Sequence, residues 1–314
     1  MLDEIAVLIP CYNEEKTIEK VITDCKTYLP DAKIYVYDNN STDKSVNIAF
    51  SNGAIVRHEY KQGKGNVVRA MFKDVDAKCY LLVDADDTYS LKNAKEMCNY
   101  VLNENFDMVI GDRLSSTYFT ENKRKFHNFG NKLVLNIINK FFKTDIKDVM
   151  TGFRCMSYEF VKTFPILTKG FEIETEMTIH TIYHNLNIKN IIVDYKDRPK
   201  DSPSKLNTFE DGFKVINEIL NLYKNYKPLQ FFTFFAIILS IIATIFFIPV
   251  LIEFTKTSKV DKFPTLITCG YVYIAAILTF FVGLILSTIA ENEKKHFEQN
   301  YINAKTTKNI LLKG

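Results

Sequence analysis

Short apolar runs alternate with segments of helical periodicity over the N-terminal two thirds of the chain. The spacing predicts strands over residues 5–9, 34–37, 54–58 and 80–83, and helices over residues 14–28, 44–51 and 66–73. Strands that alternate with helices indicate an α/β fold with a doubly wound, mostly parallel sheet. Such sheets bind ligands at the carboxyl ends of their strands, so the polar residues that follow each strand are the first candidates for function.

Two long apolar segments follow, over residues 228–252 and 263–290, and neither contains Asp, Glu, Lys or Arg. As a helix, the shorter segment would be about 37 Å long, against about 30 Å for the hydrocarbon core of a bilayer. We therefore expect two transmembrane helices. The linker over residues 253–262 is so short that the two helices should form a hairpin, with both flanks on one side of the membrane.

Two other segments have the pattern of helices that lie at a membrane surface. Residues 126–142 and residues 209–226 place aromatic and aliphatic side chains at helical spacing among polar ones. The expected organisation is an α/β domain over residues 1–205, a juxtamembrane amphipathic helix over 206–227, the hairpin over 228–290 and a tail over 291–314.

Charge and cysteine content indicate the compartment. The formal net charge of +3 is too small to suggest a nucleic-acid partner. Lysines are more frequent on the outer flanks of the hairpin than in its linker, which favours an inner-membrane protein with its N-terminal domain and both termini in the cytoplasm. The acidic start and short first apolar run do not resemble a signal peptide. The six cysteines lack Cys-Xaa-Xaa-Cys spacing, so we expect reduced, mostly buried thiols.

An acidic motif, Asp84-Ala85-Asp86, follows the predicted strand over residues 80–83. Side chains that flank one residue of an extended chain lie on the same side, and carboxylate oxygens are preferred ligands of hard divalent cations. A solvated acidic turn is the alternative interpretation. Polar clusters over residues 10–14 and 38–43 also follow predicted strands, so three such clusters should meet at one edge of the sheet.

Four motifs, taken in their order along the chain, resemble those of a known protein family. They are VLIPCYNEE over residues 7–15, DNNSTD over 38–43, GKGNVVRA over 63–70 and DAD over 84–86. This series resembles glycosyltransferase family 2 with the GT-A fold. Further motifs are GDR over 111–113, DVMTGFR over 148–154 and SKL over 204–206. The longer series is similar to the branch that transfers a sugar from a nucleotide to polyprenyl phosphate, the relatives of dolichol-phosphate mannosyltransferase, and it covers residues 4–290.

The resemblance implies a donor site at the edge of the sheet. It assigns Asp84 and Asp86 to Mg²⁺ or Mn²⁺ on the donor diphosphate, and Asp86 also to catalysis. The side chains that it assigns to the base and ribose are Pro10, Tyr12, Glu14 and Asp38. The sequence departs from its relatives at two places, with DNNS over residues 38–41 where Asp-Asp-Gly-Ser is common, and with Thr88 where Gln or another polar residue is common.

Basic residues supply further candidates for binding the donor. Lys64 lies between Gly63 and Gly65, in a loop that suits a phosphate, although an ordinary turn is the alternative. No Walker loop or Gly-Xaa-Gly-Xaa-Xaa-Gly motif is present. Arg198 and Lys205 look like the segment that closes over the donor diphosphate in relatives, although a basic linker that contacts anionic lipid would have the same composition.

The acceptor candidates are Arg113, Arg124 and His127. Guanidinium groups match phosphate oxygens, and His127 lies one turn beyond Lys123, where relatives tend to carry Ser. Asp148 is a candidate for steering the acceptor or acting as a base, with a helix-capping role as the alternative. A zinc site of Glu176, His180 and His184 is a weaker interpretation than a packed helix.

The resemblance implies an inverting, metal-dependent transfer of one sugar from a nucleotide-sugar to polyprenyl phosphate. UDP-sugars are favoured over GDP-sugars, and undecaprenyl phosphate is the expected acceptor. The product would serve later glycosylation of cell-envelope polymers or lipids. Because a phosphate monoester is already anionic near neutral pH, it can attack without a strong base, and cations neutralise the leaving diphosphate.

Three other functions compete with this one. A processive polysaccharide synthase shares the early motifs but needs a Gln-Xaa-Xaa-Arg-Trp segment, and the chain has no Trp. A transferase that uses another lipid acceptor would need a base, for which Asp148 is the candidate. A non-catalytic membrane scaffold with the same fold could recruit a flippase. A homo-oligomer could form through Gly270 and Gly283 of the hairpin.

Overall fold

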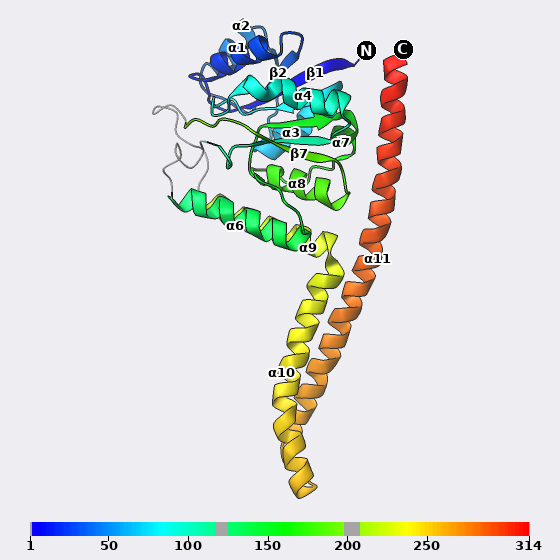
Figure 1. Ribbon diagram of the computed structural model, residues 1–314. Helices are drawn as coiled ribbons and strands as arrows, with labels where there is room; N and C mark the ends of the chain where they lie inside the picture. The colour runs from blue at the N-terminus through cyan, green and yellow to red at the C-terminus, as the bar shows by residue number, and fades with distance from the viewer. Residues whose placement is uncertain (1, 117–124, 198–207, 314) are drawn as a thin grey trace. The chain divides into compact units, whose positions relative to one another are not determined.

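The computed structural model describes residues 2–116, 125–197 and 208–313. Its contacts divide the chain into two compact units. The first unit joins Met1–Ile219 to Phe297–Gly314, and the second comprises Leu220–His296. The first unit contains the expected α/β domain, and the second contains the apolar hairpin (Figure 1).

The described strands form one seven-stranded sheet in the order β3-β2-β1-β4-β6-β5-β7. Their bounds are β1 (Asp3–Cys11), β2 (Lys33–Asp38), β3 (Ile55–His58), β4 (Ala77–Leu82), β5 (Met108–Asp112), β6 (Arg154–Ser157) and β7 (Ile188–Ile192). β6 is antiparallel to both β4 and β5, and the other pairs are parallel. The mixed, mostly parallel sheet predicted from the sequence is therefore confirmed.

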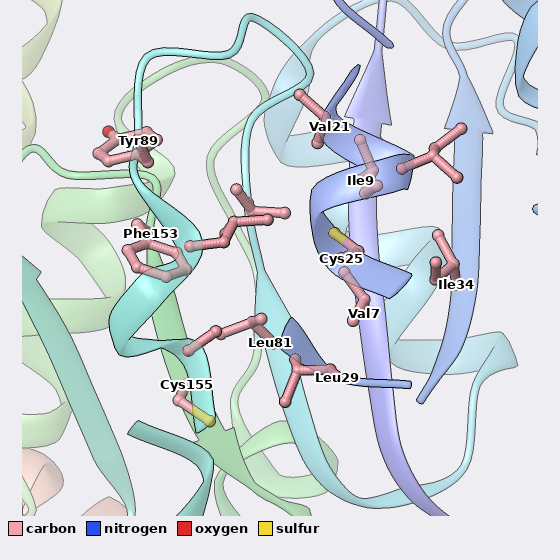
Figure 2. Packing of buried hydrophobic residues seen from close by; sticks show 14 of the residues in the cluster. Val7, Ile9, Val21, Cys25, Leu29, Ile34, Leu81, Tyr89, Phe153 and Cys155 are labelled. Carbon is pink, nitrogen blue, oxygen red and sulfur yellow. The ribbon is translucent and has the colours of Figure 1, made fainter. Parts of the chain in front are cut away.

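Helices cover both faces of the sheet (Figure 1). On one face, Val7 and Ile9 of β1 pack against Val21 and Cys25 of α1, as Figure 2 shows. Alternate residues of a strand point to opposite faces, so Leu8 belongs to the other face, which α3 and α7 cover. The helices of this domain are α1 (Ile18–Tyr28), α2 (Ser45–Ser51), α3 (Lys64–Asp74), η1 (Leu91–Asn93), α4 (Ala94–Asn103), α6 (Lys125–Phe142), α7 (Tyr158–Thr163) and α8 (Ile173–Tyr183).

Three thiols meet inside this core. Cys155 Sγ of β6 lies 3.1 Å from Cys79 Sγ of β4 and 3.6 Å from Cys98 Sγ of α4. Burial raises the pKa of Cys79 and Cys155, so these groups stay protonated and pack as small apolar side chains. All six cysteines are reduced and buried, as the sequence predicts.

The second unit contains α10 (Pro228–Thr257) and most of α11 (Phe263–Lys313). Both helices are long and apolar enough to cross a membrane, with mean hydropathies of 2.9 and 2.4 in their most apolar windows. A Cβ added at Gly283 would lie 2.9 Å from Phe232 Cβ, so this glycine permits close packing within the hairpin. A Cβ at Gly270 would meet nothing within 4 Å.

The sequence also predicts helices over residues 126–142 and 209–226, which the structure contains as α6 and α9 (Thr208–Tyr226). The predicted tail is not a separate segment, because α11 continues to Lys313. Neither Gly nor Pro occurs between residues 284 and 313, so nothing in that stretch interrupts the helix.

The C-terminal part of α11 packs on the α/β domain within the first unit. Phe297 stacks on His184 with ring centroids 3.7 Å apart. The Tyr301 hydroxyl donates to Asp107 Oδ1 at 2.6 Å, and Lys308 Nζ lies 3.0 Å from a carboxylate oxygen of Glu159. These contacts make residues 297–313 part of the folded domain.

Candidate active site

The parallel register brings the predicted polar clusters to one edge of the sheet. Cys11, at the end of β1, pairs with Asp38 at the end of β2. The backbone amide of Val83 donates to the Leu8 carbonyl, which places the acidic motif beside the same end of β1. Thr17, just before α1, donates from Oγ1 to the Ala85 carbonyl at 2.7 Å. The residue that precedes α1 therefore holds the backbone between Asp84 and Asp86.

Asp84 shares a buried ammonium group with Glu174. Lys64 Nζ lies 2.5 Å from Asp84 Oδ1 and 2.6 Å from Glu174 Oε1. Burial opposes the charge of Lys64, but the two carboxylates raise its pKa above the usual value. Burial raises the pKa of Glu174, and Lys64 counteracts this rise. A cation in contact with Asp84 is thus already a feature of this edge.

The second oxygen of Asp84 faces Gly152. A Cβ at Gly152 would lie 2.3 Å from Asp84 Oδ2, so any larger residue would displace the carboxylate. The Gly152 amide donates to the Tyr89 hydroxyl at 2.9 Å, which fixes the loop over residues 148–152 against the acidic motif. Gly152 therefore contributes to the site because its lack of a side chain leaves room for the Asp84 carboxylate.

Asp86 has different neighbours from Asp84. Its Oδ1 accepts hydrogen bonds from Thr88 Oγ1 at 2.7 Å and from the Thr88 amide at 3.2 Å. The side chain is 7% exposed. Thr88, where the sequence departs from its relatives, thus orients Asp86. Both carboxylates lie at the same edge, as predicted.

The two glycines beside Lys64 permit a close approach of two backbone segments. A Cβ at Gly63 would lie 2.2 Å from the Lys169 carbonyl oxygen, and one at Gly65 would lie 2.4 Å from that of Thr168. Gly63 also has a φ of 126°, which L side chains rarely adopt. The glycines therefore let the start of α3 pack on the segment before α8, and this packing directs Lys64 toward Asp84.

Asn39 fixes the loop that precedes Lys64. Its Nδ2 donates to the carbonyls of Glu59 at 2.6 Å and Lys61 at 2.9 Å, while its Oδ1 accepts from the Gly63 amide at 2.8 Å. An aspartate side chain at position 39 could make no such donations, so the loop depends on the side-chain amide of Asn39.

The predicted base and ribose residues surround the ends of β1 and β2. The Asp38 carboxylate accepts from the Ser41 amide and lies 3.3 Å from His58 Nδ1. Glu14 is 6% exposed, and its amide donates to Ser45 Oγ at 2.8 Å. Pro10 lies within β1, and the Tyr12 side chain just beyond it is 39% exposed.

Arg113 and Asp148 form a buried ion pair, with Nε 2.8 Å from Oδ2. Burial raises the pKa of Asp148, and Arg113 counteracts this rise. Arg154, whose side chain is fully buried, donates to the Thr151 carbonyl at 2.9 Å and to Thr178 Oγ1 at 2.8 Å. Burial lowers the pKa of Arg154 to about 10. Two arginines thus organise the loop that ends at Gly152.

Several predicted residues cannot be placed. Arg124, Arg198 and Lys205 lie outside the described residues. His127 lies within α6, but the structure describes only the backbone there. The roles of these four residues, like those of the other predicted site residues, remain predictions.

The residues of the zinc alternative have other contacts. Glu176 accepts from the amides of Leu167 and Thr168, and His180 packs edge-on against Phe164. Among the described residues, the one close group of three potential metal ligands is the buried cysteine cluster. Glu176, His180 and His184 therefore belong to a packed helix, as the favoured interpretation held.

Sequence reasoning missed three residues of this edge. Glu174 is one of them, and its carboxylate lies 2.6 Å from Lys64 Nζ. Thr17 and Asn39 act through hydrogen bonds to backbone groups far away in the sequence. Periodicity and motif spacing contain no signal for such partners.

Comparisons with known proteins match this architecture. The model of glycosyl transferase family 2 matches residues 6–164. Protein RfbJ of Shigella flexneri is 57% identical over 35% of this chain and 84% of its own length. A dolichyl-phosphate hexose transferase of Haloferax volcanii is 26% identical over 70% of this chain and 94% of its own length.

A solved structure shows the same fold. It is glucosyl-3-phosphoglycerate synthase of Mycobacterium tuberculosis in complex with Mn²⁺, UDP and glucosyl-3-phosphoglycerate. The TM-score is 0.56 at 19% sequence identity, and the match covers 70% of this chain and 80% of that one.

Proposed function

The chain belongs to glycosyl transferase family 2, and from that premise we propose that it transfers one sugar from a nucleotide-sugar to polyprenyl phosphate at a membrane surface. The observation that carries the proposal is the meeting of Asp84, Asp86 and Lys64 at the carboxyl edge of the sheet, in a chain with two helices that can span a bilayer. UDP-sugars are the favoured donors, and undecaprenyl phosphate is the favoured acceptor.

The nature of the acceptor is supported by the relatives and by the hairpin. The similar protein of Haloferax volcanii is named for transfer to dolichyl phosphate, an acceptor held in a membrane. Helices α10 and α11 would keep this chain at the same surface. The lysine bias around the hairpin supports a reaction on the cytoplasmic side of the inner membrane. The lipid-linked sugar would serve later glycosylation of the cell envelope.

The acidic motif fits a divalent cation. Its carboxylates are hard oxygen ligands, and Asp84 already acts as an ion-pair partner of the Lys64 ammonium. Asp84 and Asp86 would hold Mg²⁺ or Mn²⁺, and the synthase with the same fold binds Mn²⁺ together with UDP. When bound, the cation would neutralise charge on the leaving diphosphate.

The chain's own residues would bind and orient the two substrates. Lys64 would donate to the donor diphosphate, while Asp38 and Glu14 would contact the base and ribose. Arg113 would orient the acceptor phosphate from its place beside Asp148. A single in-line attack by the phosphate oxygen on the anomeric carbon would invert its configuration.

Product analysis tests the proposal. Membranes that contain the protein are incubated with undecaprenyl phosphate, Mn²⁺ or Mg²⁺, and a panel of UDP- and GDP-sugars. We expect one lipid-linked sugar by mass spectrometry, and none from membranes that contain Asp86→Asn. Failure of every donor with both cations would contradict the proposed function. Transfer to a lipid hydroxyl instead of a phosphate would favour the alternative acceptor.

A further inference from the structure

Glu174 holds Lys64 from the side opposite the acidic motif. The two carboxylates that contact Lys64 Nζ come from separate elements, Asp84 from the loop after β4 and Glu174 from the first turn of α8. The side chain of Lys64 is 10% exposed and that of Glu174 is 5% exposed. A buried ammonium group is stable only with charged partners, so each carboxylate contributes to holding it.

A divalent cation bound to Asp84 would compete with Lys64 for the oxygens of that carboxylate. Without a second partner, the lysine would then be a buried charge close to another cation. Glu174 supplies this partner, and its distance from Lys64 Nζ is 2.6 Å. An ammonium group has three N–H donors, and the two carboxylates accept two of them, so the third can be donated to a phosphate oxygen.

We propose that Glu174 is a positioning residue of the donor site, which retains Lys64 beside Asp84 so that the ammonium contacts the diphosphate of the nucleotide-sugar. This inference rests on the proposed function and adds to it a residue that no motif assigns. It requires that Glu174 act through Lys64 and not through its own contact with the donor.

Glu176 provides a matched control. It lies on the same helix, is 2% exposed, and accepts hydrogen bonds from the amides of Leu167 and Thr168. Glu174→Gln and Glu176→Gln each remove one buried carboxylate charge from α8. Glu174→Gln alone removes an ion-pair partner of Lys64.

The test measures nucleoside diphosphate binding by the purified full-length chain. Calorimetric titrations with UDP, and separately with GDP, are made at saturating Mn²⁺. We expect Glu174→Gln to weaken binding about tenfold, the loss expected for a misplaced charge-assisted hydrogen bond, and Glu176→Gln to change it less than about twofold. Lys64→Met should weaken binding to a similar degree, and adding Glu174→Gln to Lys64→Met should cause no further loss. Glu174→Asp, which keeps the charge, should recover part of the affinity.

Three results would overturn the inference. Equal affinity of wild type and Glu174→Gln would show that Lys64 needs no help from Glu174. A further loss in the Lys64→Met, Glu174→Gln double variant would show that Glu174 acts on the ligand independently of Lys64. Absence of Mn²⁺-dependent binding of either nucleotide by wild type would overturn the proposed function together with the inference, whereas the first two results leave the proposed function standing. The double variant lacks both the lysine charge and the Glu174 charge, so neither is buried without the other. If Glu174→Gln is too unstable to purify, comparing the double variant with Lys64→Met still tests the inference.

Discussion

Arg113 donates from Nε to Asp148 Oδ2 across 2.8 Å, and both side chains are buried. Arg113 also donates from Nη2 to the Met150 carbonyl at 2.8 Å. These bonds join the end of β5 to the loop that packs on Asp84. Two residues that the sequence assigns to separate tasks, acceptor binding and catalysis, therefore form one structural unit.

Asp148→Asn should destabilise the protein, because it removes the carboxylate that pairs with a buried guanidinium. Breaking such a pair costs about 3–5 kcal/mol, which should appear as a marked fall in the melting temperature in detergent. The double variant Arg113→Met, Asp148→Asn should be more stable than Asp148→Asn alone. Asp145→Asn is the control, since the side chain of Asp145 is 84% exposed. Loss of turnover by Asp148→Asn at an unchanged melting temperature would instead indicate a role in the reaction, either as a base or in steering the acceptor.

Asp86→Asn should lower turnover at least about 100-fold, because a metal that stabilises the leaving group contributes several kcal/mol. Asp87→Asn makes the same chemical change one residue away, where the carboxylate pairs with Lys196 at 2.6 Å. It should retain most activity. Radiolabelled sugar transfer to lipid measures both variants, and membrane fractionation checks their insertion. Comparable activity of Asp86→Asn and wild type would rule out the metal assignment.

Gly152→Ala should displace Asp84, since the added Cβ would lie 2.3 Å from its Oδ2. We expect a loss of Mn²⁺-dependent nucleotide binding of about tenfold or more. Gly270→Ala is the control, because a Cβ there meets nothing within 4 Å and alanine is the better helix former by up to about 1 kcal/mol. Titration calorimetry compares the two variants. If Gly152→Ala binds as wild type does, the fit between the 148–152 loop and Asp84 has no functional importance.

Tyr301→Phe should destabilise the α/β domain. It removes the hydroxyl that donates to Asp107 Oδ1 at 2.6 Å, a carboxylate that also accepts from the Asn187 amide. Loss of a hydrogen bond to a charged group costs about 1.5–3 kcal/mol. Tyr271→Phe, on the same helix but 70% exposed, should have little effect on the melting temperature. Equal melting temperatures for the two variants would mean that the hydrogen bond from Tyr301 to Asp107 does not stabilise the domain.

His180 should make the protein sensitive to mild acid. Burial, aided by His184, lowers the pKa of His180 from 6.5 to about 3. Below pH 6.5 the unfolded chain binds a proton that the folded chain does not, so stability falls as the pH drops, by up to about 1.4 kcal/mol per unit. His180→Leu should reduce the change in melting temperature between pH 7 and pH 5. His296 is exposed, and His296→Gln should leave that change as it is in the wild type. An unchanged slope in His180→Leu would assign the acid sensitivity to other groups.

The sequence predicts the fold well where the signal is local. Apolar runs and their spacing locate β1 to β4 and the first helices, because a buried strand and a half-buried helix each require a fixed period. Charge-free segments locate α10 and α11 for the same reason. The continuation of α11 to Lys313 is not predicted in this way. The sequence pattern over residues 291–313 does not distinguish a helix packed on the domain from a polar tail.

The site is predictable in part. Motif order predicts a shared site for Asp84, Asp86 and Lys64, and the structure brings the three residues to one edge of the sheet. The partners that orient them come from distant segments, as Glu174 does for Lys64. Pairing of this kind depends on how helices pack on the sheet, which no short stretch of sequence encodes.

Asn39 has a consequence for how the loop before Lys64 can change in this chain. All three hydrogen-bond partners of its side chain, at Glu59, Lys61 and Gly63, are main-chain groups. Substitutions at the exposed Tyr60 therefore leave these bonds in place, whereas Glu59 supports the loop with its side chain, whose Oε1 accepts from the Lys61 amide at 2.7 Å. The outer surface of the loop is thereby separated from the placement of Lys64, which follows it.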